Sequence, residues 1–398
     1  MTRVSTADFY RQNIDSIQRQ QSLVLQVQNQ LSSGKKLLTA SDDPTGAARG
    51  LALDQTLSSN NRYNTNTRLA NERLGFEENA LTAVNDTLNS VRERVLQGNG
   101  GTLGDSDRHS IALDLRQSLL QVLNYANTPD AEGRYIFAGS NDSAAPFSIS
   151  AAGTTYSGDD IVRQVQVGPQ RFVQTGDAGS EIFLRIRSGD GTISIGASAA
   201  NTGTGTIASA KLANPNAYDG GTYTLSFNGN AYQVVDAGNN VVTSGTYQAG
   251  DAISFRGVDL TVTGVPQTGD TFTVRPSQQQ DLFTTIRNLA DLLDTPTDAN
   301  PALRAQVQTG LLEGLKSLET AQGQVIDARA TLGARLQSAD DASNQLGSQS
   351  VQIQTALSGL RDIDYAEAAG RLNQELTGLQ AAQQSFARVQ GLSLFNYL

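Results

Sequence analysis

Apolar residues recur at helical spacing near both ends of the chain. Ile17, Val24 and Leu31 follow one another at every seventh position, and Ile14 precedes the first of them by one turn. This spacing places the side chains on one face of a helix. The C-terminal part carries the longest repeat, in which every seventh position is apolar: Val325, Leu332, Ala339, Leu346, Ile353 and Leu360. The repeat predicts roughly 54 Å of continuous helix, far more than a globular helix usually has.

The middle of the chain has a different pattern, rich in Gly, Thr, Val and Tyr. Apolar and polar residues alternate with period two in TYTLSFNGNAYQVV and ISFRGVDLTVTG, and also earlier, in TTYSGD, IVRQVQVG and EIFLRIRSGDGTISIG. Turn dipeptides such as Asn228-Gly229 and Asp190-Gly191 lie within these stretches. The alternation and the turns together predict β-hairpins and a small β domain inserted between two helical halves.

Each helical end is interrupted at a joint. In LSSGKKLLTASDDPTGAARG, residues 31–50, the glycine can end one helix and the Asp-Asp-Pro can begin the next, with an aspartate capping free amides and the proline in the first turn. In RDIDYAEAA the long repeat stops, and a new register continues through Leu372, Leu379 and Phe386. The predicted joint residues are Gly34, Asp42, Asp43, Pro44, Asp362 and Asp364.

Long helices with a single apolar stripe gain most of their stability by packing that stripe against another element. Pairing helices from the two chain ends satisfies this need and brings the two joints to one level. The predicted fold class is therefore α+β, an elongated multi-domain protein with a heptad-patterned helical bundle, β-hairpins and an inserted all-β domain. The expected domains are a terminal helical coiled-coil module that is disordered in the free monomer (1–40 with 362–398), a helical bundle with β-hairpins (41–187 with 278–361) and the β domain (188–277).

Composition excludes several classes of function. The net charge is -10, with 29 basic and 39 acidic residues, whereas binding to nucleic acid needs clustered Lys and Arg. The chain has no Cys and a single His, which leaves no thiolate nucleophile and no multi-His metal site. No catalytic, cofactor-binding or metal-binding residues are predicted. The N-terminus has no unbroken apolar leader and no stretch is long enough to span a membrane, so no membrane association is expected.

The few residues that could carry chemistry have simpler structural explanations. Asp362 and Asp364 could act as an acid/base pair, but nothing near them would orient a substrate, and they suit the start of a helix. His109 lies among acidic residues at another helix start and is expected at the surface. The glycine run GNGGTLG matches no phosphate-binding spacing and follows a helix, so it is predicted to be a turn. The turn TGDAGSE could hold a calcium ion only weakly, because ordinary hairpin turns have the same composition.

Apolar residues at the extreme ends exceed what a two-helix hairpin can cover, and exposed apolar surface of this kind marks association with another protein surface. Burial between subunits is therefore the preferred interpretation. The predicted interface residues on the terminal helices are Ile14, Ile17, Val24, Leu31, Leu372, Leu379, Phe386, Val389, Leu392 and Phe395.

Several motifs together resemble the flagellin superfamily of bacterial flagella: LSSGKKL followed by SDDPTGAA, the helix-ending ANTPDAEGRYIFAGS and the C-terminal RDIDYAEA. The start MTRVSTADFYRQNIDSIQRQQ, the Asp-Asp-Pro joint and the length are similar to members at the junction between hook and filament. The resemblance implies a secreted, extracellular structural protein of the flagellum, exported unfolded by type III export with a chaperone on its C-terminal helix. It also implies that copies form a ring between a neighbouring hook-associated protein and filament flagellin.

Two alternatives stay open at the level of the sequence. A filament flagellin would share the helical ends and would polymerise alone into long filaments. An extracellular adhesin would use the β domain for binding and the helices as a stalk. An enzyme has no supporting residues in the chain.

Overall fold

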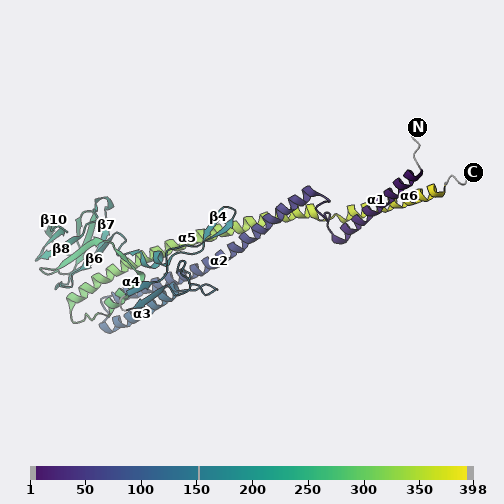
Figure 1. Ribbon diagram of the computed structural model, residues 1–398. Coiled ribbons are helices and arrows are strands. Elements are labelled where there is room, and N and C mark those ends of the chain that lie inside the picture. The colour runs from purple at the N-terminus through teal and green to yellow at the C-terminus, as the bar shows by residue number, and fades with distance from the viewer. Residues whose placement is uncertain (1–5, 151–152, 392–398) are drawn as a thin grey trace, which may run out of the picture. The chain divides into compact units, whose positions relative to one another are not determined.

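The computed structural model describes residues 6–150 and 153–391 (Figure 1). The helices of the described chain are α1 (Thr6–Ser33), α2 (Pro44–Gly98), α3 (Asp105–Ala126), α4 (Leu282–Asp294), α5 (Pro301–Arg361) and α6 (Tyr365–Gly391). Strands lie between α3 and α4, so the fold is α+β, as the sequence predicts. These residues divide into two compact units, one made of 1–65 with 342–398 and the other of 66–341. The boundary falls inside α2 and α5, so both helices contribute to both units.

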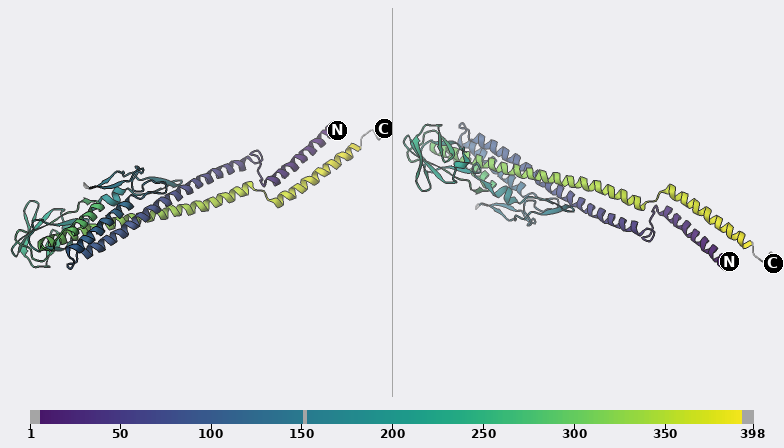
Figure 2. Two further views of the ribbon diagram at one scale, coloured as in Figure 1. Left: turned by 90° about the horizontal axis from the view of Figure 1, so that it is seen from below. Right: turned by 90° about the horizontal axis from the view of Figure 1, so that it is seen from above.

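In the first unit, α1 and α6 lie side by side and run in opposite directions, as the views in Figures 1 and 2 show. The buried apolar residues of this unit include Val24 and Val27 of α1 and Leu346 and Ile353 of α5. The seven-residue stripe of α1 runs only to Leu31, because the helix stops at Ser33. Leu38, the next apolar residue at that spacing, therefore lies in the connection to α2.

In the second unit, the cores of α2, α3 and α5 follow the predicted periodicities. Leu74, Leu81 and Leu88 of α2 are fully buried, and so are Val325 and Leu332 of α5. On α3 the buried apolar residues are Ile111, Ala112, Leu115, Leu119, Val122 and Ala126. The residues at seven-residue spacing in α2 and α5 therefore lie on the buried faces of these helices. The run GNGGTLG forms the turn between α2 and α3.

Helix α4 packs closely against its neighbours because they carry glycine at the contact points. A Cβ atom on Gly98 of α2 would lie 2.6 Å from Leu293, and one on Gly314 of α5 would lie 2.4 Å from Leu289. Both leucines are fully buried. Any larger residue at either glycine would push α4 away, so these glycines set how near the helices come.

Short antiparallel hairpins follow α3. Strand β1 (Phe147–Ser150) pairs with β2 (Gly153–Tyr156), and β3 (Gln164–Gly168) pairs with β4 (Arg171–Gln174). The expectation of a strand through EIFLRI is wrong in its first part, because Ser180–Leu184 forms a π-helical turn, η1. Ile182 and Phe183 are both buried there, whereas adjacent residues of a strand point to opposite faces.

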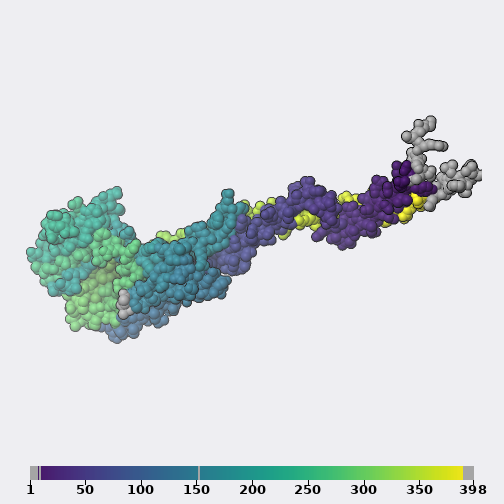
Figure 3. Space-filling view, viewed as in Figure 1, coloured from purple at the N-terminus to yellow at the C-terminus, as the bar shows by residue number. Residues whose placement is uncertain are grey.

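The inserted region is an antiparallel β domain joined to the bundle by two short strands that pair with each other, β5 (Ile186–Arg187) and β14 (Gln279–Gln280). One sheet has the order β10-β9-β8-β13-β6 and the other β11-β12-β7. Aromatic residues such as Tyr223, Phe227 and Phe272 fill its core. The space-filling view shows this domain as a rounded lobe of its unit (Figure 3). The elements are β6 (Ile193–Ala197), β7 (Thr206–Leu212), the 3₁₀ turn η2 (Pro215–Ala217), β8 (Tyr223–Asn228), β9 (Ala231–Asp236), β10 (Val241–Thr246), β11 (Ala252–Phe255), β12 (Val258–Thr263) and β13 (Thr271–Pro276).

A row of polar side chains on α5 holds the inserted domain through its backbone. These side chains recur every three or four residues, so they share one face of the helix. Thr309 and Ser317 are almost fully buried, and burial also raises the pKa of Glu313. The contacts are the amide of Ile207 to the Thr309 hydroxyl (3.2 Å), the amide of Ile195 to the Glu313 carboxylate (3.0 Å) and the amide of Gly189 to the Ser317 hydroxyl (2.7 Å).

Replacing one member of this row should loosen the domain. In Thr309→Val the shape is kept, but the buried amide of Ile207 loses its acceptor, which costs about 1–3 kcal/mol. We expect urea unfolding followed by circular dichroism to show this loss. The control is Thr331→Val, because Thr331 is exposed and its hydroxyl bonds only within its own helix. Equal effects of the two substitutions would contradict the role of the polar row.

Candidate functional site

The strongest candidate for a functional surface is the pair of helices at the chain ends. The ring centroids of Tyr10 and Phe386 lie 6.0 Å apart in an edge-to-face contact. Further along, the Gln20 side-chain amide donates a hydrogen bond to the Glu375 carbonyl (3.3 Å). The helices therefore pair along much of their length, and the joints meet at the end of this pair.

The predicted interface residues differ in burial within this single chain. Val24 is buried, and Ile14 is 44% exposed. The others whose side chains are described are half-buried: Ile17, Leu31, Leu372, Leu379 and Phe386. The side chain of Val389 and the whole of Leu392 and Phe395 lie outside the described residues. The structure brings together those it describes on one helix pair, and their role between subunits stays a prediction.

Apolar side chains of α1 remain uncovered on both flanks of the buried stripe. Leu23 is 43% and Leu25 is 58% exposed, and they flank the buried Val24 in the sequence. At about 100° per residue, they point to opposite sides of α1, and Ile14 falls on the same side as Leu25. A helix with this pattern can be covered completely only by neighbours on both sides.

The unit that contains these helices is nearly neutral. Residues 1–65 and 342–398 contain 10 basic and 9 acidic residues, which leaves 19 of the 29 basic and 30 of the 39 acidic residues in the other unit. The net negative charge of the chain therefore comes entirely from the other unit. Copies can approach one another through the neutral unit without strong repulsion between like charges.

The two joints are hydrogen-bonded to each other. Gly34 has a φ of 70°, which ends α1, and its carbonyl accepts a hydrogen bond from the amide of Ile363 (3.0 Å). The amide of Lys36 donates to the carbonyl of Arg361 (2.7 Å), and Lys35 forms an antiparallel bridge with Asp362. These backbone contacts fix where both helices end and where the next ones begin.

Aspartates at the joints cap the helices that follow. The Asp43 carboxylate accepts the amide of Gly46 (2.9 Å), and Pro44 is the first residue of α2. Asp364 accepts the amides of Ala366 and Glu367 at the start of α6 (2.9 and 3.1 Å).

The remaining joint aspartates make different contacts. Amides of Thr39 and Leu38 donate to Asp42 and hold its pKa below the ordinary value. The Ser358 hydroxyl donates to Asp362. The joint carboxylates thus have structural partners.

Side chains that the sequence analysis missed also brace the joint. Arg361 forms two hydrogen bonds to the Asp54 carboxylate, one of them 3.0 Å long, and this contact raises the pKa of the guanidinium. The side-chain amide of Gln30, which is buried, donates to the carbonyl of Lys36 (2.7 Å). The spacing of residues gives no signal for the Arg361 contact, because its partner lies some 300 residues away in the chain.

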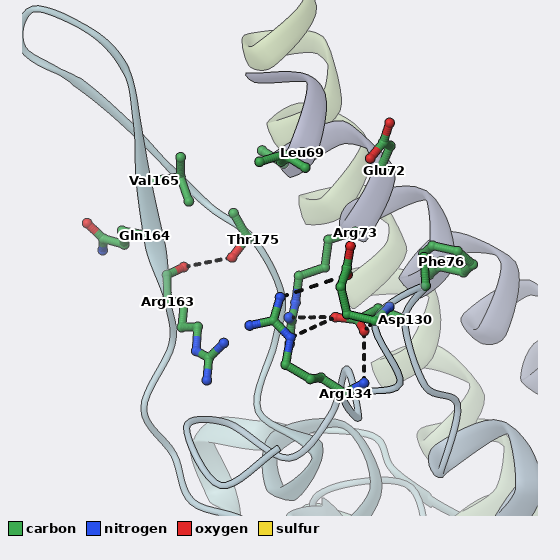
Figure 4. Close-up of a pocket in the computed structure, with 13 residues that line it drawn as sticks. Leu69, Glu72, Arg73, Phe76, Asp130, Arg134, Arg163, Gln164, Val165 and Thr175 are labelled. Carbon is green, nitrogen blue, oxygen red and sulfur yellow. Dashed lines mark hydrogen bonds and ion pairs between the residues drawn. The ribbon is translucent and has the colours of Figure 1, made fainter. Parts of the chain in front are cut away.

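A cavity of about 610 Å³ lies in the other unit, between α2 and the β3–β4 hairpin (Figure 4). Part of its charged lining is paired internally: Arg73 lies 3.0 Å and Arg134 lies 3.7 Å from the Asp130 carboxylate. No cluster of metal-ligating side chains occurs among residues 6–150 and 153–391. Within the same ranges no helix is long and apolar enough to cross a membrane.

Comparison with known proteins gives a consistent result. The family model described as the bacterial flagellin N-terminal helical region matches residues 4–142, and the C-terminal helical region matches 315–398. The model for the D2-like domain of flagellar hook-associated protein 1 matches 197–276. Both chain ends and the inserted domain therefore match flagellar families.

Similarity extends over nearly the whole chain. Flagellar hook-associated protein 3 of Escherichia coli (strain K12) is 26% identical over 394 residues, covering 99% of this chain and 98% of the relative. The crystal structure of FlgL from Xanthomonas campestris is 36% identical, with a TM-score of 0.73 over 77% of this chain and 99% of that one. Hook-associated protein-3 from Legionella pneumophila is 28% identical, with a TM-score of 0.74 over 78% of this chain and 98% of that one.

The geometry of the joint gives a direct test. In Gly34→Ala a Cβ atom would lie 3.0 Å from the Tyr365 hydroxyl, in a backbone conformation that non-glycine residues adopt at a cost of about 1–2 kcal/mol. We expect the helices of this unit to melt at lower temperature in assembled protein, in which the terminal helices are ordered. Gly347→Ala, inside α5 of the same unit, has open space and should instead stabilise the helix by about 0.5–1 kcal/mol. Thermal unfolding that shifts in the same direction for both variants would refute this account of Gly34.

Proposed function

This chain belongs to the flagellar hook-associated protein 3 (FlgL) family, and we propose on that premise that it forms the junction layer between hook and filament. Its role is that of a structural component of the bacterial flagellum. One observation carries the mechanism: the neutral helix pair at the chain ends leaves apolar side chains uncovered on both flanks of α1. The filament-flagellin and adhesin alternatives are less favoured, because the similarity to hook-associated protein 3 covers the chain from end to end.

Copies of the chain would assemble side by side into a ring. Each uncovered flank of α1 can pack against a different neighbouring copy. Helix α1, which is only partly covered within one chain, then becomes covered on both sides. Burying apolar surface contributes about 25 cal/mol per Å², so several leucines per contact give a substantial free energy of association. The residues proposed at these contacts from the sequence are Ile14, Ile17, Val24, Leu31, Leu372, Leu379, Phe386, Val389, Leu392 and Phe395. Val24 is already buried within the chain, and we add Leu23 and Leu25 on the uncovered flanks.

The layers above and below the ring would be the neighbouring hook-associated protein and filament flagellin. The helical ends of this chain match the family models of flagellin itself, which supports packing of like helices between layers. Export to the outside of the cell, with a chaperone on the C-terminal helix, belongs to the same proposal. No catalysis is involved, which agrees with the structural role of the flagellar relatives.

Three domains would divide this work. The terminal module, 1–40 with 362–398, would make the contacts between copies and would be disordered in the free monomer. The bundle, 41–187 with 278–361, would support it, and the β domain, 188–277, would form the outer part. The joint at Gly34 and the paired strands β5 and β14 support these divisions.

The flanks of α1 can be tested separately in cells. Leu25→Asp and Leu23→Asp each place a charge on one uncovered flank, so each should block ring closure. We expect export of the variant protein, hooks without filaments, filament protein shed into the medium and loss of motility. The control is Leu113→Asp on α3, which is 51% exposed in the other unit. Normal motility of both α1 variants, with protein present outside the cell, would overturn the proposed contacts.

Limited proteolysis tests the disorder expected of the free ends. In a dilute monomer both ends should be trimmed to a core of about 45–355, because segments that cannot bury enough apolar surface stay accessible. Assembled protein should resist the same treatment. Ends that resist cleavage and show protected amides in the monomer would contradict folding upon assembly.

A further inference from the structure

The β3–β4 hairpin and the segment that follows it cover one side of α2. The Asn66 side-chain amide donates a hydrogen bond to the carbonyl of Gln166 in β3 (2.9 Å). Between this contact and the base of the hairpin lies the cavity described above, lined by Ala70 and Phe76 of α2 and by Val165 of β3 (Figure 4). The hairpin is thus the outer wall of this hollow, and it is anchored by its buried residues Val167 and Val173.

The returning segment, residues 175–178, rests on a buried carboxylate. The amide of Asp177 donates to one Glu77 oxygen (3.1 Å), and the carboxylate of Asp177 lies 2.8 Å from the Arg335 guanidinium on α5. A Cβ atom on Gly176 would lie 3.7 Å from the other Glu77 oxygen. The backbone of this segment therefore separates Glu77 from solvent.

Glu77 is fully buried, and its second oxygen has no hydrogen-bond partner among the described residues. The charged groups around it are engaged elsewhere: Arg73 of its own helix pairs with Asp130, and Arg335 of α5 pairs with Asp177. Burial, and then the negative charge of Asp177, raise the pKa of Glu77 from 4.5 to about 8. The enclosed carboxyl group is therefore protonated at neutral pH.

We propose that the β3–β4 hairpin is a proton-controlled flap over the cavity, closed while Glu77 is protonated and loosened when Glu77 ionises. An ionised carboxylate that has no unpaired cation beside it is costly to bury, so it must be hydrated by water. Helix α2 cannot supply it by moving, because Leu74 and Leu81 on either side of Glu77 are fixed in the core. The segment with Gly176 and Asp177 is bonded to Glu77 itself through the amide of Asp177, and the negative charge of Asp177 repels the ionised group. Lifting this segment away from Glu77 would let water reach the ionised carboxylate.

The direction of the pH dependence follows from the two states. The closed state binds the proton more tightly than the open state, in which the pKa is the ordinary 4.5. The opening equilibrium therefore rises with pH between 4.5 and about 8 and levels off outside this window. Between pH 6 and pH 8 the rise is roughly fifty-fold.

Hydrogen exchange of the full chain measures this opening. Protection factors, which are corrected for the intrinsic pH dependence of exchange, should fall roughly fifty-fold between pH 6 and pH 8 for peptides covering 164–178. In Glu77→Gln, which keeps an acceptor for the Asp177 amide but cannot ionise, they should stay constant. The control is Glu72→Gln, an exposed cavity residue of the same helix paired with Arg68, which should behave like the wild type. Constant protection in the wild type, or an equal fall in Glu77→Gln, would overturn the proposal.

A second measurement covers the case in which Glu77→Gln does not fold. The chain has no cysteine, so Ala70→Cys places one thiol on a cavity residue that is only 1% exposed. Thiol labelling at this position should rise with pH more steeply than at the exposed control, Leu113→Cys, where only thiolate formation contributes. Equal slopes would contradict a flap. Because these assays use the free chain, they do not depend on assembly and can fail independently of the proposed junction role.

Discussion

The antiparallel pairing of helices from opposite ends of the chain is the interaction on which the described structure depends. It packs α1 against α6, and it brings two connections, residues 34–43 and residues 362–364, to the same place. There the backbones of Gly34 and Ile363, and of Lys36 and Arg361, bond to each other. Since α2 begins and α5 ends at these connections, the same hydrogen bonds also mark where these two helices start and stop.

Charge is distributed unevenly between the two units. The unit that contains Leu23 and Leu25 is nearly neutral, and the acidic excess lies in the other unit, which also exposes leucines such as Leu113. Association by apolar burial is favourable only where repulsion is weak, whereas a net charge far from zero keeps an exposed surface soluble. The same chain therefore combines a region suited to packing with copies of itself and a region that resists it.

Local periodicity predicted the helices, the joint and most of the β segments. Val325 and Leu332 are buried as their spacing indicates, and Gly34 and Pro44 lie at helix boundaries. The polar row on α5 could not be predicted. The partners of Thr309 and Ser317 are backbone amides more than 100 residues away in the chain, so the local sequence does not distinguish these two residues from surface residues. The turn at Ile182 and Phe183 was missed for a related reason. The alternation of apolar and polar residues cannot show that two adjacent side chains both point into the same core.

The sequence predicted interface residues on the terminal helices, but Leu23 and Leu25, which the structure leaves exposed, were not among them. Spacing alone does not reveal that Leu23 and Leu25 stay exposed on opposite flanks of Val24, because this depends on how much of the α1 surface its partner helix covers. The buried polar groups differ from one another in whether they have a hydrogen-bond partner. Thr309 and Ser317 each have a partner, as buried polar groups in folded proteins almost always do, whereas one oxygen of Glu77 has none among the described residues. An unsatisfied group costs stability wherever it is buried, so the segment 175–178, which separates Glu77 from solvent, covers a group whose hydration would be favourable.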